Sequence, residues 1–144
     1  MDPSGFQARY IDEQIGRGVF TLHDIKKGDF LLEYSGELIS KKEVLQREEE
    51  YKMKEKGNFM FFFKVNGTEY CVDSTKSSNR LGRLVNDGER ARVRNCRITL
   101  ILISDTPRLA FFAVRDIKSG EELRYDYGVP GLPWRRKNWE KNVW

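Results

Sequence analysis

The sequence has few of the residues that bind metals or form covalent intermediates. Its 144 residues include two cysteines, Cys71 and Cys96, and one histidine, His23. No Cys-x-x-Cys or His-x-x-x-His spacing occurs, so a structural zinc site would lack ligands. A Ser-His-Asp or Cys-His catalytic system would have to use His23, which lies just before a turn signal. We therefore expect no metal site, no nucleophilic triad and, with two isolated thiols, no disulfide framework.

Long apolar runs are also absent. No run of ~18 apolar residues could form a membrane-spanning helix, and the N-terminus lacks the hydrophobic region of a signal peptide. We expect a soluble, intracellular chain with no membrane partner, and its length suits one domain. Lysine plus arginine number 26 against 22 aspartate plus glutamate. The resulting net charge of +4 suits an acidic or polyanionic partner.

The chain consists mainly of short strand patterns between turn signals. These patterns cover residues 19–22, 30–34, 59–65, 68–72, 98–103, 109–114 and 123–127. Asn66-Gly67 predicts a type I′ hairpin turn, and residues 104–108 predict a longer hairpin loop. One helix is expected from the capping box at Ser40 to Lys56, before Gly57. The fold class is therefore mainly β, in a single domain.

One polar segment occurs twice. Residues 24–31, DIKKGDFL, recur as residues 116–123, DIKSGEEL. Each copy follows one apolar strand pattern and precedes another, which indicates the same polar turn used twice.

Three tyrosines have an unusual placement. Tyr125 and Tyr127 lie at i and i+2, on one face of an expected strand, and Tyr34 ends another strand. Aromatic residues in strands are ordinarily core residues. Alternatively, these rings line a channel that suits the methylene stem and charged head of an extended cationic side chain. Spacing alone leaves both interpretations open.

Two loops also carry candidate functional residues. Gly16-Arg17-Gly18 lacks the dinucleotide-binding fingerprint, and we interpret it as a tight turn before a strand. Residues 79–88 fit neither a helix nor a strand, which predicts a structured loop. The arginines of that loop are assigned to a solvated surface.

Taken in order, these pieces resemble the SET-domain protein lysine methyltransferases. The landmarks are Gly16–Val19, Gly28–Phe30, Glu33–Gly36, Tyr70–Asp73, Asn79–Leu84, Asn95-Cys96, Arg115–Ile117, Gly120–Leu123 and Tyr125–Gly128. They cover roughly residues 14–128, and their order is far more specific than any one motif. Within the family, the sequence most resembles the branch that monomethylates lysine 20 of histone H4.

The resemblance implies a fold and an activity. The fold is a SET domain over residues 1–128, with small curved sheets, one main helix and a short tail at 129–144. A pseudo-knot would bring the Asn86 loop near the Tyr127 strand. The activity would be S-adenosylmethionine-dependent methyl transfer to a lysine amine of a histone-like tail, with monomethylation of histone H4 expected. The products would include S-adenosylhomocysteine, no metal would take part, and the protein would be a monomeric nuclear chromatin regulator that acts on histone peptides or nucleosomes.

The resemblance also assigns residues to roles. Tyr127 matches the catalytic tyrosine, Tyr34 lines the channel, and Tyr125 occupies a switch position where tyrosine implies monomethylation. Residues expected to contact the cofactor are Ile15, Gly16, Arg17, Gly18, Phe59, Asn86, Asp87 and Trp134.

Two positions depart from the family pattern and keep other functions open. Asp87 stands where the family has the histidine of an Asn-His pair, and Phe59 stands where the H4 branch has a tyrosine. They favour an alternative function, a catalytically weakened SET domain that binds cofactor or peptide on chromatin. The basic runs 90–94 and 135–137 suggest a third, contact with nucleic acid such as nucleosomal DNA.

Overall fold

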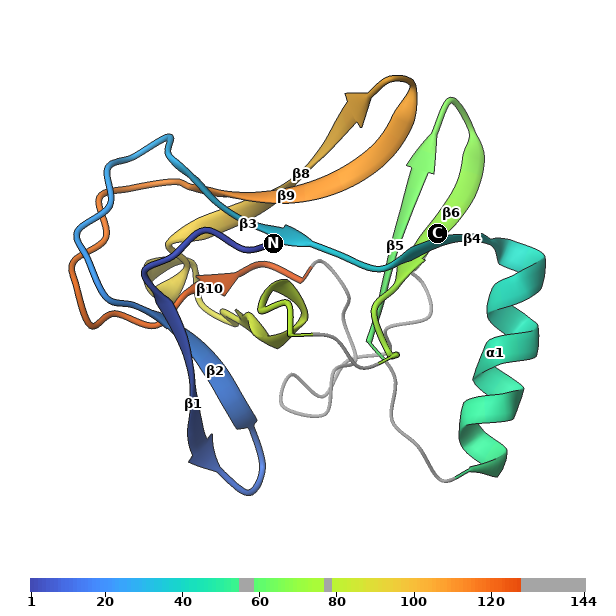
Figure 1. Cartoon of the computed structure of the whole chain (residues 1–144), viewed down its shortest axis with the longest axis horizontal. Coiled ribbons are helices and arrows are strands. Elements are labelled where there is room, and N and C mark those ends of the chain that lie inside the picture. The colour runs from blue at the N-terminus through green and yellow to red at the C-terminus, as the bar shows by residue number, and fades with distance from the viewer. Residues whose placement is uncertain (55–58, 77–78, 128–144) are drawn as a thin grey trace. The chain divides into compact units, whose positions relative to one another are not determined.

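In the computed structural model, the chain folds into two compact units (Figure 1). The first unit combines residues 1–34 with 80–127, and the second contains residues 35–79. Each unit is described by itself. The residues that the structure describes are 1–54, 59–76 and 79–127.

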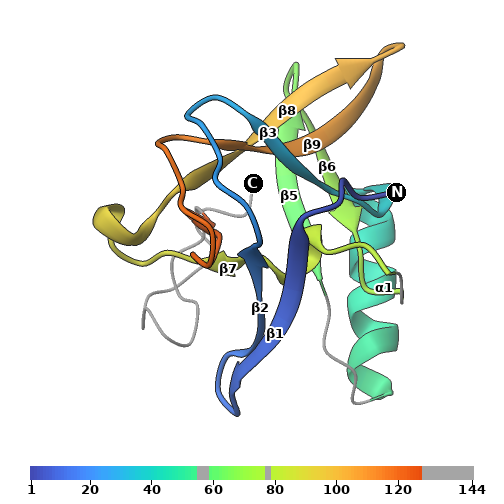
Figure 2. The ribbon, with the colours of Figure 1, turned by 60° about the vertical axis from the view of Figure 1, so that its left-hand side comes forward.

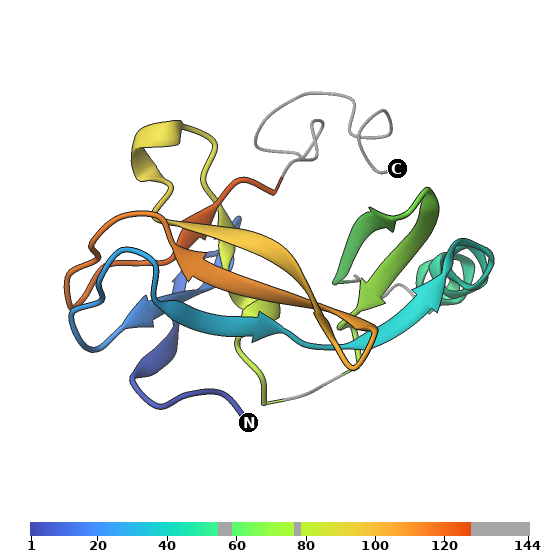
Figure 3. The same cartoon turned by 90° about the horizontal axis from the view of Figure 1, so that it is seen from above.

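The first unit contains an antiparallel sheet of three strands. Their order is β3 (Phe30–Tyr34), β9 (Thr106–Ala113) and β8 (Cys96–Ile103), so β9 is central. Figure 3 shows the three strands side by side. Leu32 of β3 and Phe111 of β9 pair with each other and are fully buried, which places the apolar core of this unit against the sheet.

The hairpin that joins β8 to β9 is tighter than the sequence suggested. Ser104 and Asp105 have φ angles of 50° and 64°, as a two-residue turn requires, and Thr106 already pairs with Ile103. The expected loop over 104–108 is therefore wrong. Pro107 is tolerated inside β9 because β3 pairs with β9 only from Leu109 onward, which leaves β9 a free edge at the proline.

A second hairpin in this unit joins β1 (Phe6–Asp12) to β2 (Gly16–Thr21) (Figure 2). The sequence reading missed β1, which has no strict apolar alternation. The predicted turn, at Gly16–Gly18, also lies too late in the chain. Gly16 and Gly18 belong to β2, and the turn between the strands is at residues 13–15.

The most consequential pairing of the first unit is a short parallel one. β7 (Asn86–Asp87) lies beside β10 (Arg124–Tyr125), with Asn86 opposite Arg124. This confirms the expected passage of the Asn86 loop beside the Tyr127 segment. The final strand is shorter than expected, because only two residues of 123–127 are paired in it. Short 3₁₀ helices, η1 (Gly82–Leu84) and η2 (Ala91–Val93), flank β7.

The duplicated polar segment forms two turns that bind each other. Ile25 and Ile117 exchange backbone hydrogen bonds of 2.7 and 2.9 Å. Each turn also binds an amide of the other through its leading aspartate, Lys27 to Asp116 and Ser119 to Asp24, both at 2.9 Å. The prediction of one turn used twice is confirmed, and the reciprocal bonds tie the early and late parts of this unit together.

The second unit has its own three-stranded sheet and the helix α1 (Lys41–Met53). The sheet order is β4 (Glu37–Ser40), β6 (Thr68–Asp73) and β5 (Met60–Val65), all antiparallel. Asn66 and Gly67 have φ angles of 50° and 81°, which confirms the expected turn of the β5–β6 hairpin.

Helix α1 begins where the sequence predicted. The Ser40 hydroxyl accepts a hydrogen bond from the Glu43 amide, so the capping interaction is confirmed. The helix ends at Met53, one residue before Lys54, which is its cap, and residues 55–56 of the expected helix lie outside the described residues. Only Val44 and Tyr51 of the helix are buried, as expected for a mostly solvated helix.

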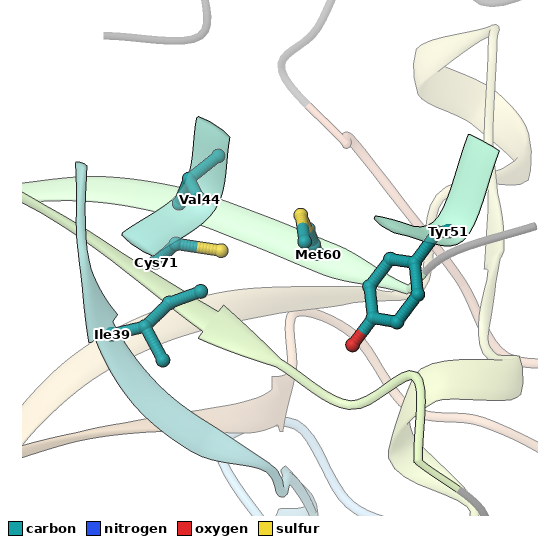
Figure 4. Packing of buried hydrophobic residues seen from close by; sticks show 5 residues of the cluster. All are labelled: Ile39, Val44, Tyr51, Met60 and Cys71. Atoms are coloured by element: carbon teal, nitrogen blue, oxygen red, sulfur yellow. The ribbon is translucent and has the colours of Figure 1, made fainter. Parts of the chain in front are cut away.

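The core of the second unit lies between α1 and its sheet. Figure 4 shows Val44 and Tyr51 of the helix facing Ile39, Met60 and Cys71 of the strands. Burial raises the pKa of the Cys71 thiol to about 12, so this cysteine is an apolar packing residue and not a nucleophile.

A buried carboxylate joins the helix to the sheet. Asp73, at the end of β6, is only 2% exposed. Its carboxylate accepts hydrogen bonds from the Tyr51 hydroxyl at 2.6 Å, the Thr75 amide at 2.9 Å and the Arg47 guanidinium at 3.0 Å. Arg47 also binds Glu37 of β4 at 3.0 Å. Both helix residues are therefore fixed to the sheet through one carboxyl group.

The hydrogen bonds of Asp73 decide its protonation. Burial pushes the pKa of this carboxyl up, but bonds from Thr75, Tyr51 and Arg47 outweigh burial and hold the pKa below its ordinary 3.8. A carboxyl whose pKa is lower in the folded than in the unfolded state stabilises the fold fully above the ordinary value. That contribution is lost as the pH falls through the folded pKa.

Asp73→Asn should therefore lower the free energy of unfolding by about 2–4 kcal/mol at neutral pH, because two donors of α1 lose a charged acceptor. The deficit against the wild type should shrink as the pH falls below about 4. Urea titrations followed by circular dichroism at several pH values measure both effects. Glu50→Gln, in an exposed pair with Lys54, is the control and should change stability by less than about 0.5 kcal/mol. A deficit that does not depend on pH would contradict the prediction.

Candidate active site

Three of the predicted site residues meet around Tyr125 in the first unit. This residue of β10 is 1% exposed. Its ring lies edge-on to Phe111, with centroids 4.9 Å apart, and 5.7 Å from the ring of Tyr127. Burial raises the pKa of the Tyr125 phenol well above 10, and neighbours including Tyr127, Tyr34 and Asp87 raise it further. The hydroxyl therefore stays protonated at neutral pH and can donate or accept a hydrogen bond.

Tyr127 is positioned through its backbone. Its amide donates to Oδ1 of Asp87 at 2.9 Å, and the Gly88 amide donates to the carbonyl of Tyr125 at 2.6 Å. Asp87 is 5% exposed and lies opposite Tyr125 in the β7–β10 pairing. The residue that replaces the family histidine thus fixes the backbone of the candidate catalytic tyrosine.

Tyr34 reaches this part of the unit from β3 and is also buried. The structured loop 79–88 packs against its strand. A Cβ atom on Gly82 would lie 2.1 Å from the carbonyl oxygen of Glu33, so only glycine permits this approach. Arg80 of the loop binds Asp2 at 2.8 Å and contacts Glu33 at 3.5 Å. The assignment of the loop arginines to a solvated surface is therefore wrong for Arg80.

Asn86 lies beside the β1–β2 hairpin. Its amide nitrogen donates to the carbonyl of Arg17 and to Oε2 of Glu122, both at 3.0 Å. A Cβ atom on Gly18 would lie 2.4 Å from Glu122 and 3.0 Å from Asn86. The missing side chain of Gly18 thus lets the three segments converge. Among the described residues, nothing donates to the amide oxygen of Asn86.

The remaining cofactor candidates have mixed positions. Ile15 is exposed, and its amide donates to Asp12 at 2.7 Å. Gly16 begins β2 with a φ of 80°, and the Arg17 side chain is exposed. Phe59 belongs to the second unit, where its amide donates to Thr75 at 2.8 Å. Trp134 lies outside the described residues.

This donor set fits the amino-acid end of S-adenosylmethionine. The amide oxygen of Asn86 can accept a hydrogen bond from an α-ammonium group. The described residues contain no group of three or more histidine, cysteine or acidic side chains that could hold a metal ion. No helix in the described ranges is long and apolar enough to cross a membrane.

Two residues of the site were not singled out from the sequence. Glu122 bonds to Asn86 and, through Oε1, to Arg124 at 3.0 Å. Asn95 is almost fully buried and holds β10, donating to the carbonyl of Glu122 at 2.8 Å and accepting from the Arg124 amide at 2.9 Å. Both lie inside motifs of the resemblance. The residue directly before each of them is itself polar, so composition gave no further signal for either residue.

The small curved sheets, the parallel β7–β10 pairing and the buried tyrosines define a SET-domain architecture. The family model described as the SET domain matches residues 16–128, and the chain belongs to this family. The expected fold class is thereby confirmed.

The relatives include proteins named as lysine methyltransferases. The N-lysine methyltransferase KMT5A-A of Danio rerio is 42% identical over 137 residues, which cover 90% of this chain and 39% of that protein. The histone-lysine N-methyltransferase Set8 of Drosophila melanogaster is 40% identical, over 86% of this chain and 18% of that protein. The expected family and branch are confirmed.

Solved structures agree with this relationship. CpSET8 from Cryptosporidium superposes with a TM-score of 0.77 at 38% identity, covering 85% of this chain and 57% of that one. An autoinhibited ctPRC2 bound to S-adenosylmethionine has a TM-score of 0.73 at 31% identity, over 86% of this chain and 15% of that one. The chain thus spans less than two thirds of each of these four proteins.

Proposed function

We propose that this chain transfers a methyl group from S-adenosylmethionine to the side-chain amine of a lysine in a histone-like tail. The observation that carries the proposal is the cluster of buried Tyr125 and Tyr34 with half-buried Tyr127, in contact with Asp87 of β7. Relatives named as N-lysine and histone-lysine methyltransferases support the reaction, and the ctPRC2 structure supports the cofactor. Histone H4 is the proposed substrate, the nucleus the proposed location and a monomer the proposed state.

The cofactor supplies an electrophilic methyl group on a sulfonium, and the chain's task is to present a neutral amine to it. A lysine of pKa ~10.4 is neutral in about one molecule in a thousand near pH 7.4. Removal from water in this buried site disfavours the ammonium and so lowers that pKa. The phenols of Tyr125 and Tyr127 then orient the amine lone pair, and alignment supplies much of the rate. The new N–C bond forms as the C–S bond breaks, and the methylated amine loses its proton to solvent.

The first test is methyl transfer itself. The chain is incubated with S-adenosylmethionine and either an H4 tail peptide or nucleosomes, and mass spectrometry looks for the addition of one CH₂. Tyr127→Phe should abolish turnover, because the amine loses its orienting hydroxyl, while calorimetric affinity for the cofactor stays nearly unchanged. Tyr10→Phe removes an exposed phenol elsewhere in the first unit and should have no effect. Absence of product on both substrates would remove the enzymatic function.

The second test concerns the degree of methylation. The Tyr125 hydroxyl is fully buried beside Tyr127 and Tyr34, so it occupies space that a second methyl group would need. Tyr125→Phe should therefore allow a dimethylated product, which mass spectrometry resolves from the monomethylated one. An unchanged product distribution would argue against the switch role of Tyr125.

The departures at Asp87 and Phe59 leave a binding module as the second candidate function. In that case the chain would hold cofactor or peptide on chromatin without useful turnover. Calorimetry separates the two functions when read with the methyl-transfer test. Cofactor or peptide binding without product favours the module, and binding with product favours the enzyme.

We further propose a secondary contact with nucleosomal DNA through the arginines around η2. Residues 80–127 contain nine arginines and one lysine, and the planar guanidinium suits phosphate. Arg90 and Arg92 are exposed, and within the described residues neither side chain has a hydrogen-bond or ion-pair partner. Arg92 also lines a hollow of about 340 Å³, where Arg115 and Arg124 are paired with Glu121 and Glu122.

The double variant Arg90→Gln/Arg92→Gln should weaken binding to duplex DNA and reduce the slope of log K against log salt by about two. Fluorescence anisotropy at several salt concentrations measures the slope. Lys26→Gln/Lys27→Gln makes the same charge change on an exposed turn and is the control. Equal slopes for both double variants would show that the effect is only one of net charge.

A further inference from the structure

Asp87 is a charged side chain buried in the candidate active site. We propose that its carboxylate has two separable effects on methyl transfer: it positions the backbone of Tyr127, and its charge favours the ammonium form of the bound lysine. This inference rests on the proposed function. It concerns the residue at which this chain departs from its family.

The positioning effect follows from one hydrogen bond. Oδ1 of Asp87 accepts from the Tyr127 amide at 2.9 Å, where β10 has just ended. The Tyr127 backbone therefore depends on this side chain at the point where ladder pairing stops. An asparagine could accept the same bond through its amide oxygen, whereas alanine could not.

The charge effect follows from the neighbours of Asp87. Arg124 and Arg94 bond to the backbone of Asp87 and Gly88 and are paired with Glu122 and Asp126, respectively. Tyr127 bonds to the Asp87 carboxylate, and Tyr34 and Cys96 act together with Asp87 on Tyr125. Arg124 donates to the Asp87 carbonyl at 3.0 Å, but its guanidinium is paired with Glu122. Burial raises the pKa of the Cys96 thiol to about 12, and the phenols are uncharged near pH 7.

The electrostatic influence of Asp87 also reaches the centre of the site. Asp87 is 5% exposed and lies opposite Tyr125 in the β7–β10 pairing. Burial is the largest cause of the raised pKa of the Tyr125 phenol, and the negative charge of Asp87 is a smaller cause, after Tyr127 and Tyr34. A charge that disfavours a phenolate favours an ammonium at the same place. Asp87 should therefore strengthen binding of the protonated lysine and oppose the loss of its proton before methyl transfer.

The experiment compares Asp87→Asn with Glu89→Gln, which removes an exposed carboxylate two residues away. The apparent pKa on the acidic limb of the kcat–pH profile should fall by about one unit in Asp87→Asn, because the amine deprotonates more readily. At pH values below that apparent pKa, kcat should rise severalfold, and the KM for the peptide should rise as well. Glu89→Gln should match the wild type in the apparent pKa, in kcat and in KM.

Asp87→Ala isolates the positioning effect. This variant loses the acceptor as well as the charge, so its kcat should fall below that of Asp87→Asn at every pH, with no further displacement of the limb. A purely structural role would lower kcat in both variants without moving the limb. Equal pH profiles for Asp87→Asn and the wild type would overturn the charge effect, and equal kcat values for the two Asp87 variants would overturn the positioning effect.

A calorimetric readout keeps this inference separate from the proposed function. The lysine peptide should bind Asp87→Asn several times more weakly than the wild type at neutral pH, whether or not methyl transfer occurs. Weaker binding without any methyl transfer by the wild type would defeat the proposed function and support the charge effect. Methyl transfer with equal peptide affinities would support the function and overturn the charge effect.

Discussion

The pairing of Asn86–Asp87 with Arg124–Tyr125 is the contact on which the site depends. Two residues in parallel register provide little stability by themselves. Asn95 completes the pairing from the other side of β10, since its backbone and side chain bond to Glu122 and Arg124. The buried Asn95 thus makes the hydrogen bonds to β10 that a neighbouring strand would otherwise make. Asn95 therefore holds β10 at the point where Asn86 and Asp87 pair with it.

The same arrangement explains how a chain with one histidine can be proposed as an enzyme. Methyl transfer to an amine needs no covalent intermediate on the protein, only a neutral nucleophile held in line with its target. Buried phenols supply the apolar surroundings and the orienting hydroxyls together. The scarcity of histidine and cysteine, which argued against triads and zinc sites, is therefore compatible with this chemistry.

Local signals in the sequence predicted the local structures. Ser40 and the Asn66-Gly67 turn each specify a geometry within a few residues, and both appear as expected. The strand pattern missed β1. It also gave the β8–β9 hairpin too long a loop, because a proline in a strand is tolerated only where no neighbouring strand needs its amide. At Pro107 this holds, since β3 does not reach that part of β9. The resemblance, and not periodicity, predicted that residues 86 and 127 lie together. The bond of Tyr127 to Asp87 could not be read from the chain, since it joins side chain and backbone across the fold.

Asp87 illustrates why a family pattern leaves such details open. A histidine at this position brings a ring that is neutral or positive, whereas the carboxylate brings a negative charge into the same buried place. Asp87 acts on Tyr125 together with two phenols and a thiol, and among these four groups the carboxylate is the one that is charged near neutral pH. The backbone geometry of the family can therefore persist while the electrostatics change sign. A relative's fold transfers to this chain more safely than its pH dependence.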